Sequence, residues 1–86
     1  MIISGIVMTS RPGRLKELRE TLDAIAWLDV HFCEESGRMV VTIEAADVEE
    51  SIVRLRDLQE LPDVGMAELS HYYIEGNETH TEEAHP

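Results

Sequence analysis

The sequence predicts one small domain of the α+β class, in which two helices cover one side of a four-stranded sheet. Apolar stretches and helical stripes follow one another in the order strand, helix, strand, and this order then repeats. The dipeptide Asp29-Val30 recurs as Asp63-Val64, one strand-helix-strand unit further along the chain. Two such units combine into one sheet with both helices on the same side, which leaves the other side bare.

The first unit begins with a strand at residues 2–9, which are rich in residues that suit a pleated surface. The turn at residues 10–13 ends this strand, and Pro12 lies where the first turn of a helix tolerates a missing N–H. A helix is predicted for residues 14–25, and a second strand for residues 30–34. The apolar stripe of the helix has helical spacing and consists of Leu15, Leu18, Leu22 and Ile25.

A hairpin connects the second strand to a third strand at residues 39–45. Gly37, in the connection at residues 35–38, supplies the positive φ that a tight turn requires. Successive side chains of a strand point to opposite faces of the sheet. The third strand therefore directs Met39, Val41 and Ile43 to one face, and Arg38, Val40, Thr42 and Glu44 to the other.

The second helix starts after Asp47, a favourable N-cap, and Glu50 completes a capping box. Pro62 ends this helix before a fourth strand at Val64–Ile74. The buried stripe of the helix is predicted to be Val48, Ile52, Leu55 and Leu58. The strand period places Ala67, Leu69, His71 and Tyr73 on the inner face, and Met66, Glu68, Ser70 and Tyr72 on the outer face.

The order β-α-β-β-α-β is that of the ferredoxin-like arrangement. Right-handed crossovers, found in about 98% of cases, give the strand order 4-1-3-2. The domain is predicted to cover residues 1–74, and the acidic residues 75–86 are expected to form a disordered tail. The sheet residues expected to pack under the two helical stripes are Ile6, Met8, Val30, Phe32, Met39, Val41, Ile43 and Leu69.

The charge balance limits the possible partners. Eighteen acidic residues against seven basic ones give a formal net charge of −11, which repels nucleic acid and favours cationic partners. The single cysteine, Cys33, excludes an internal disulfide and fits a reducing compartment. Residues 1–8 are apolar but lack the basic start and the cleavage site of a secretory signal. We therefore expect a cytoplasmic protein without stable membrane association.

The sequence offers no convincing catalytic or metal-binding set, so we predict neither an enzyme nor a cofactor. His31 and Cys33 would share a strand face and could form half of a metal site, but no second pair has ligand spacing. Arg11 and Arg14 lie between a strand and a helix, where an anion could bind the helix N-terminus. The glycine series of a phosphate loop is missing there. A simple capped turn is the favoured interpretation, and the anion question stays open.

The bare side of the sheet is the strongest candidate site. Its residues are predicted to be Gly5, Val7, Thr9, Val40, Thr42, Glu44, Met66, Glu68, Ser70 and Tyr72. Such a surface suits an amphipathic peptide, because apolar side chains fill the shallow centre and cationic ones meet carboxylates at the rim. On composition alone, a dimer interface or plain solvent exposure is an equally good interpretation.

Several motifs, in this order, resemble the NapD family of small cytoplasmic assembly chaperones of periplasmic nitrate reductase. They are residues 3–7 (ISGIV), residues 36–45 (SGRMVVTIEA), Asp47 at the helix start, Val64-Gly65, Tyr72-Tyr73 and the acidic tail. The resemblance implies a protein that binds the twin-arginine signal peptide of the nitrate reductase catalytic subunit. Binding would delay export until the molybdenum cofactor is inserted. We expect a monomer in this role.

An alternative from another class shares the same topology. Small regulatory modules of the amino-acid-binding type use this fold, commonly as dimers with a small ligand between the subunits. A strictly monomeric protein in the absence of ligand would disfavour this alternative.

Overall fold

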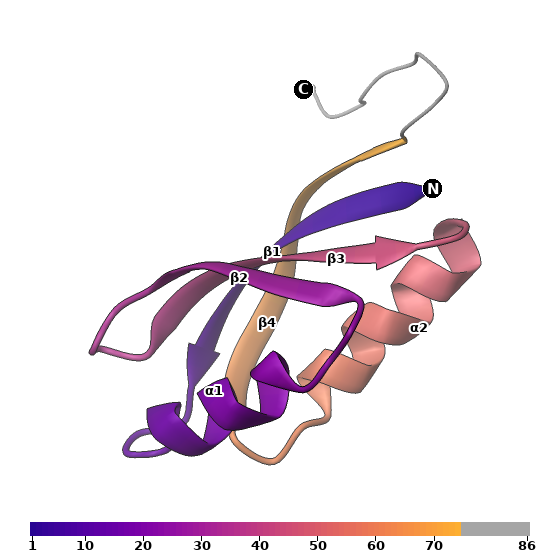
Figure 1. Ribbon diagram of the computed structural model, residues 1–86. Helices are drawn as coiled ribbons and strands as arrows, with labels where there is room; N and C mark the ends of the chain where they lie inside the picture. The colour runs from indigo at the N-terminus through magenta and orange to yellow at the C-terminus, as the bar shows by residue number, and fades with distance from the viewer. Residues whose placement is uncertain (75–86) are drawn as a thin grey trace.

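Six elements follow one another in the predicted order, with both helices on one side of the sheet (Figure 1). The computed structural model describes residues 1–74, so the predicted tail at residues 75–86 lies outside the described residues. The elements are β1 (Ile2–Ser10), α1 (Leu15–Asp23), β2 (Leu28–Cys33), β3 (Arg38–Ala45), α2 (Val48–Gln59) and β4 (Val64–Ile74). The sheet is antiparallel with the order β2-β3-β1-β4, which is the predicted order read from the opposite end.

The two central strands, β1 and β3, pair without interruption, so their side chains alternate as predicted. Val7 lies opposite Val40, and Gly5 lies opposite Thr42, on the side that the helices leave bare. This side of the sheet is called the open face below. The helix-side residues of both strands that are completely buried are Ile6, Met8, Met39, Val41 and Ile43.

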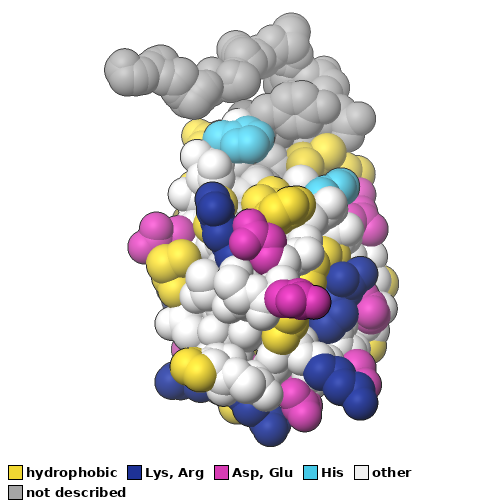
Figure 2. Space-filling view, turned by 90° about the vertical axis from the view of Figure 1, so that its left-hand side faces the viewer, with side chains coloured by type: hydrophobic (Ala, Val, Ile, Leu, Met, Phe, Trp, Pro, Cys, Tyr) yellow, Lys and Arg dark blue, Asp and Glu magenta, His cyan; other side chains and the backbone are white. Residues whose placement is uncertain are grey.

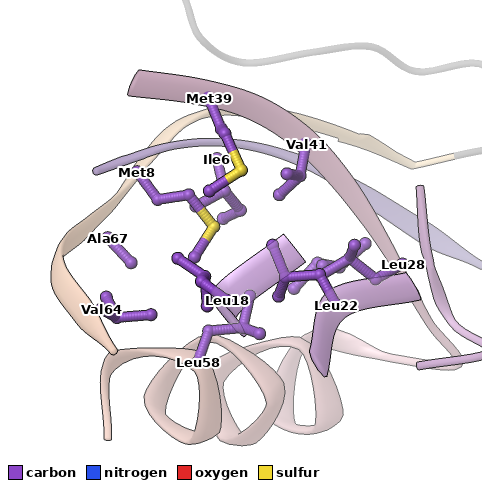
Figure 3. Close-up of a cluster of buried hydrophobic side chains, with 11 residues drawn as sticks. Ile6, Met8, Leu18, Leu22, Leu28, Met39, Val41, Leu58, Val64 and Ala67 are labelled. Atoms are coloured by element: carbon purple, nitrogen blue, oxygen red, sulfur yellow. The ribbon is translucent and has the colours of Figure 1, made fainter. Parts of the chain in front are cut away.

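The hydrophobic core lies between the sheet and the helices (Figure 3). Helix α1 contributes Leu18 and Leu22 to it, both with no exposed surface, and α2 contributes Leu58. Complete burial of each such side chain stabilises the fold by about 1.5–3 kcal/mol relative to exposure. The core is therefore concentrated under α1 and under the C-terminal end of α2.

The N-terminal half of α2 does not close onto the sheet, which contradicts the prediction of a fully buried stripe. Val48 is 49% exposed and Ile52 is 51% exposed. Their expected partner on β4, Leu69, is 46% exposed. The physical reason is that only the last turns of α2 reach the core cluster, where Leu58 is inserted.

Strand β4 contains a bulge that reverses its alternation. Its register with β1 shifts between Gly5 and Ile6, so that Leu69 pairs with Ile6, His71 pairs with Gly5, and Ser70 is the extra residue. His71 therefore lies on the open face and Tyr72 lies on the helix side, opposite Ser4. The predicted positions of His71 and Tyr72 were both wrong.

Strand β2 is irregular in the same way. Its register with β3 shifts between Val30 and Phe32, and His31 has no partner in the ladder. Phe32 lies opposite Val40 on the open face and is 47% exposed, so its predicted place in the core was wrong. Cys33, opposite Met39, packs against the core on the helix side.

The turns and helix starts are largely as predicted. Gly37 has a φ of 102° in the hairpin turn. Helix α1 is shorter than the predicted range 14–25: it begins at Leu15, after a turn at Pro12 and Gly13, and ends at Asp23 with Ala24 as its C-cap. At the start of α2, the Asp47 carboxylate accepts a hydrogen bond from the Glu50 N–H at 2.8 Å. The Glu50 carboxylate accepts a hydrogen bond from the Ala46 N–H at 2.7 Å. In a standard capping box it would accept from the N–H of the N-cap residue itself, which here is Asp47.

Replacing Asp47 with alanine is expected to destabilise the domain by about 1 kcal/mol, because one N–H of the first helical turn loses its acceptor. In a domain of this size the loss lowers Tm by about 4–8 °C, which thermal unfolding followed by circular dichroism will measure. Asp57→Ala is the matched control, since Asp57 is exposed near the other end of α2 and caps nothing. Equal losses in both variants would contradict the capping role.

Candidate peptide-binding surface

The open face contains residues from all four strands. Register and alternation place there Asp29, His31 and Phe32 of β2, Arg38, Val40, Thr42 and Glu44 of β3, Ile3, Gly5, Val7 and Thr9 of β1, and Met66, Glu68 and His71 of β4. All the predicted site residues lie on this face except Ser70 and Tyr72. Ser70 is the extra residue of the β4 bulge, and Tyr72 lies on the opposite side of the sheet.

A row of residues crosses the middle of the open face, with a histidine at each end. Thr42 lies opposite Gly5, and Gly5 lies opposite His71. The His71 ring lies over Gly5, because a Cβ added to Gly5 would approach the ring to 2.9 Å. At the other end, the His31 Nε2 is 2.7 Å from the Thr42 Oγ1, within hydrogen-bonding distance. The centre of the face is therefore shallow and is flanked by two imidazole rings.

Val7 occupies the centre of the neighbouring row. Val40 lies on one side of it and Glu68 on the other. Val7 and Val40 are half-buried by their neighbours, whereas Glu68 is exposed. The middle of the open face thus combines small apolar side chains with a carboxylate at their border.

The charged side chains of the open face are mainly acidic. Asp29, Glu44 and Glu68 are all exposed, and none of them forms an ion pair within residues 1–74. Figure 2 shows yellow hydrophobic side chains interspersed with charged ones on one side of the molecule, where both described histidines are also visible. The face therefore offers separate apolar contacts and uncompensated negative charge, which together suit a partner with both positive and apolar groups.

Residues 1–76 match the family model described as NapD protein. The chain belongs to the NapD family. Among solved structures, it is similar to that of the E. coli Tat proofreading chaperone protein NapD, with a TM-score of 0.73 and 22% sequence identity. The match covers 98% of this chain and 92% of the E. coli chain, and it shows a common fold. A search of curated proteins found no match.

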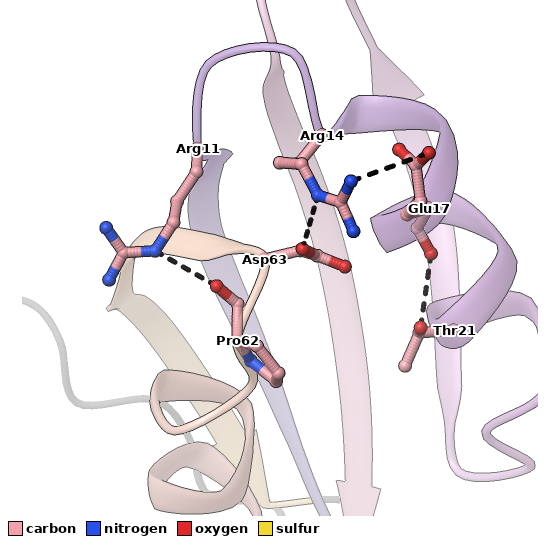
Figure 4. Close-up of polar contacts among 6 residues, drawn as sticks. All are labelled: Arg11, Arg14, Glu17, Thr21, Pro62 and Asp63. Carbon is pink, nitrogen blue, oxygen red and sulfur yellow. Dashed lines mark hydrogen bonds and ion pairs between the residues drawn. The ribbon is translucent and has the colours of Figure 1, made fainter.

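In this NapD-family chain, side-chain hydrogen bonds connect the loop before α1 to the loop before β4 (Figure 4). The Arg11 Nε donates to the Pro62 carbonyl oxygen at 3.0 Å, and the Arg14 Nε donates to the Asp63 carboxylate at 2.8 Å. The hydrogen bond to Asp63 and its negative charge raise the pKa of Arg14 above the ordinary value. Both arginines are therefore engaged by acceptors of the chain itself, which disfavours an anion site here, although no side chain caps the start of α1.

The NapD-family chain does not bring His31 and Cys33 together. His31 lies beside Thr42 on the open face, and the bulge in β2 moves Cys33 to the helix side. The predicted shared strand face of His31 and Cys33 was wrong for this reason. Within residues 1–74, no three His, Cys, Asp or Glu side chains are grouped as metal ligands.

Over the described residues, no helix is long and apolar enough to cross a membrane.

The two-residue period did not predict that His71 would lie on the open face of this NapD-family chain. The bulge in β4 brings it there, and the extra residue, Ser70, is not the glycine that commonly marks a bulge. His31 directly follows the helix-side Val30, so it lies on the open face by ordinary alternation.

Proposed function

We propose that this protein is a chaperone that binds the twin-arginine signal peptide of the periplasmic nitrate reductase catalytic subunit precursor. Binding on the open face would delay export until the molybdenum cofactor is inserted. Membership of the NapD family supports this proposal, as does the name of the E. coli protein with the same fold, a Tat proofreading chaperone. On this proposal the protein acts as a monomer in the cytoplasm, needs no cofactor and catalyses no reaction.

The observation that carries the proposal is the uncompensated negative charge around a half-apolar centre. A twin-arginine signal peptide has a cationic segment followed by an apolar one. Its arginines would meet Asp29, Glu44 or Glu68 at the rim, while apolar side chains would cover Val7 and Val40. The charges mainly accelerate encounter, whereas the desolvated apolar contacts set the residence time.

Calorimetry with a synthetic leader of the nitrate reductase catalytic subunit tests the proposal. The native leader should bind, and a leader with both arginines replaced by alanine should bind at least tenfold more weakly. The affinity for the native leader should also fall as salt is raised, since exposed charges are screened over about 8–10 Å at physiological ionic strength. A leader that fails to bind, or that binds equally well without its arginines, would contradict the proposal.

Light scattering of the protein without ligand addresses the alternative regulatory module. A monomeric mass agrees with the chaperone proposal. A stable dimer that binds a free amino acid and ignores the leader would favour the small-molecule module.

A further inference from the structure

A second concave surface lies on the other side of the sheet, between α2 and the outer strand β4. It is an apolar pocket with a volume of about 200 Å³. Its lining comes from β1, β4 and α2 and consists of Ile2, Ser4, Ile6, Val48, Ser51, Ile52, Leu55, Leu69 and Tyr72. This surface is called the α2–β4 pocket below.

The residues at this pocket are the ones whose spacing predicts burial. Val48, Ile52 and Leu55 form a regular apolar stripe, yet only Leu55 packs against the core, and Val48 and Ile52 remain about half exposed. Large apolar side chains gathered at one place on a surface indicate an interaction site, because isolated ones are common but clusters are not. The stripe is therefore available to an apolar group from outside the chain.

A buried hydroxyl group at the pocket has no hydrogen-bond partner among residues 1–74. Ser4 is only 4% exposed, and its side chain forms no hydrogen bond with any residue that the structure describes. Buried polar groups are nearly always hydrogen-bonded, and leaving one unsatisfied costs about 1–3 kcal/mol. A ligand that carries a polar group next to an apolar one, as every peptide does, would satisfy Ser4.

The size of the pocket limits the kind of ligand. Sites for drug-sized molecules measure about 300–1,000 Å³, whereas an apolar cavity of about 150 Å³ is enough to hold benzene. A volume of about 200 Å³ therefore fits one large apolar side chain and excludes a drug-sized molecule. This size favours a peptide anchored by a leucine, isoleucine, methionine or phenylalanine.

Strand β4 connects the pocket to the open face. Glu68 and His71 of this strand face the open side, while Leu69 and Tyr72 line the pocket. Two exposed carboxylates, Glu49 next to Val48 on α2 and Glu68 on β4, form no ion pair within the described chain. The same combination of apolar surface and negative charge thus continues around β4.

We propose that the α2–β4 pocket binds one large apolar side chain from the apolar segment of the leader peptide whose arginines meet the open face. The bound leader then contacts the chain on both sides of β4. This inference rests on the proposed function, because it takes the same peptide as the ligand.

Two neighbouring substitutions on α2 test the inference. Ile52 and Val53 are 51% and 49% exposed, but only Ile52 lines the pocket. In calorimetry with the native leader, Ile52→Glu should weaken binding at least tenfold, equivalent to about 1.4 kcal/mol. Val53→Glu introduces the same charge one residue away and should stay within twofold of the unmodified protein. Circular dichroism and thermal unfolding check that both variants are folded.

A double-mutant cycle identifies the side chain that enters the pocket. Each large apolar residue of the leader is replaced in turn by alanine and titrated against the unmodified protein and against Ile52→Ala. At one leader position, replacement by alanine should reduce the affinity for Ile52→Ala much less than the affinity for the unmodified protein, because residues in contact have non-additive effects. Additive losses at every leader position would overturn the inference.

Other outcomes separate this inference from the proposed function. If Val7→Glu abolishes leader binding while Ile52→Glu leaves it unchanged, only the pocket inference fails. If the unmodified protein does not bind the leader, both proposals fail. If sedimentation shows a dimer that Ile52→Glu converts to a monomer without peptide, a second copy of the chain occupies the pocket and the inference is overturned.

Discussion

Replacing Val7 with glutamate is expected to weaken leader binding at least tenfold while the domain remains folded. Val7 lies on the open face between Val40 and Glu68, and it is only partly buried in the free protein. A carboxylate at this position cannot be covered by an apolar side chain of the leader without losing its hydration, and that loss is costly. The stability of the free domain should change less than the affinity for the leader, because water reaches the new side chain when no peptide is bound.

Charge and apolar contact can be separated at the same position. Val7→Lys removes the same contact as Val7→Glu but adds a positive charge, so it should bind the cationic leader more weakly still. Val40→Glu should resemble Val7→Glu, since the two valines lie opposite each other in the central strands. Val53→Glu on α2 controls for added negative charge away from the open face. Affinities within twofold of the unmodified protein for both Val7→Glu and Val40→Glu would exclude the open face as the peptide site.

Replacing Leu22 with alanine is expected to lower the free energy of unfolding by about 2–5 kcal/mol. Leu22 has no exposed surface and packs in the core cluster between α1 and the sheet. The change removes apolar contacts and leaves a cavity that the surrounding side chains fill only in part. Since a domain of this size has about 4–13 kcal/mol of stability, the loss is a large share of the total. Urea unfolding at constant m-value measures it.

Leu69→Ala is the matched control, because it deletes the same atoms from a side chain that is 46% exposed. Its cost should be less than half that of Leu22→Ala, since little apolar surface returns to water and the pocket beside it is already open. Equal costs would mean that α2 closes on β4 in solution, and the α2–β4 pocket would then be absent.

The sequence predicted the regular part of the fold correctly. Residues of β1 and β3 alternate strictly between apolar core positions and open-face positions, and their pairing has no shift. Capping at Asp47 and the turn at Gly37 were also predictable, because each depends on the chemistry of one or two residues. Local signals therefore sufficed wherever the structure is locally regular.

The bulges at Ser70 and His31 could not be predicted in this way. A single extra residue at Ser70 exchanges the faces on which His71 and Tyr72 lie. The extra residue at His31 has the same effect on Phe32. Neither position carries a glycine or a proline, so the choice between regular and bulged pairing depends on tertiary packing.

The incomplete burial of α2 has a different cause. The spacing of Val48, Ile52 and Leu55 shows that one side of the helix is apolar, but not what covers it. An apolar helical stripe has the same sequence period whether it packs on the sheet of its own chain or binds another molecule. Only the tertiary structure distinguishes these two cases: Leu58 is buried in the core and Leu55 packs against it, whereas Val48 and Ile52 remain about half exposed.

The irregular pairing also affects how the molecule meets copies of itself. All register shifts involve β2 or β4, the two strands whose outward backbone groups have no neighbour in the sheet, whereas the central pair is regular. Free sheet edges template strand-by-strand polymerisation, and bulges that distort them hinder it. The irregular edge strands thereby protect this acidic protein, which exposes apolar surface, from stacking into fibres. The surfaces that remain accessible for recognition are the faces of the sheet, not its edges.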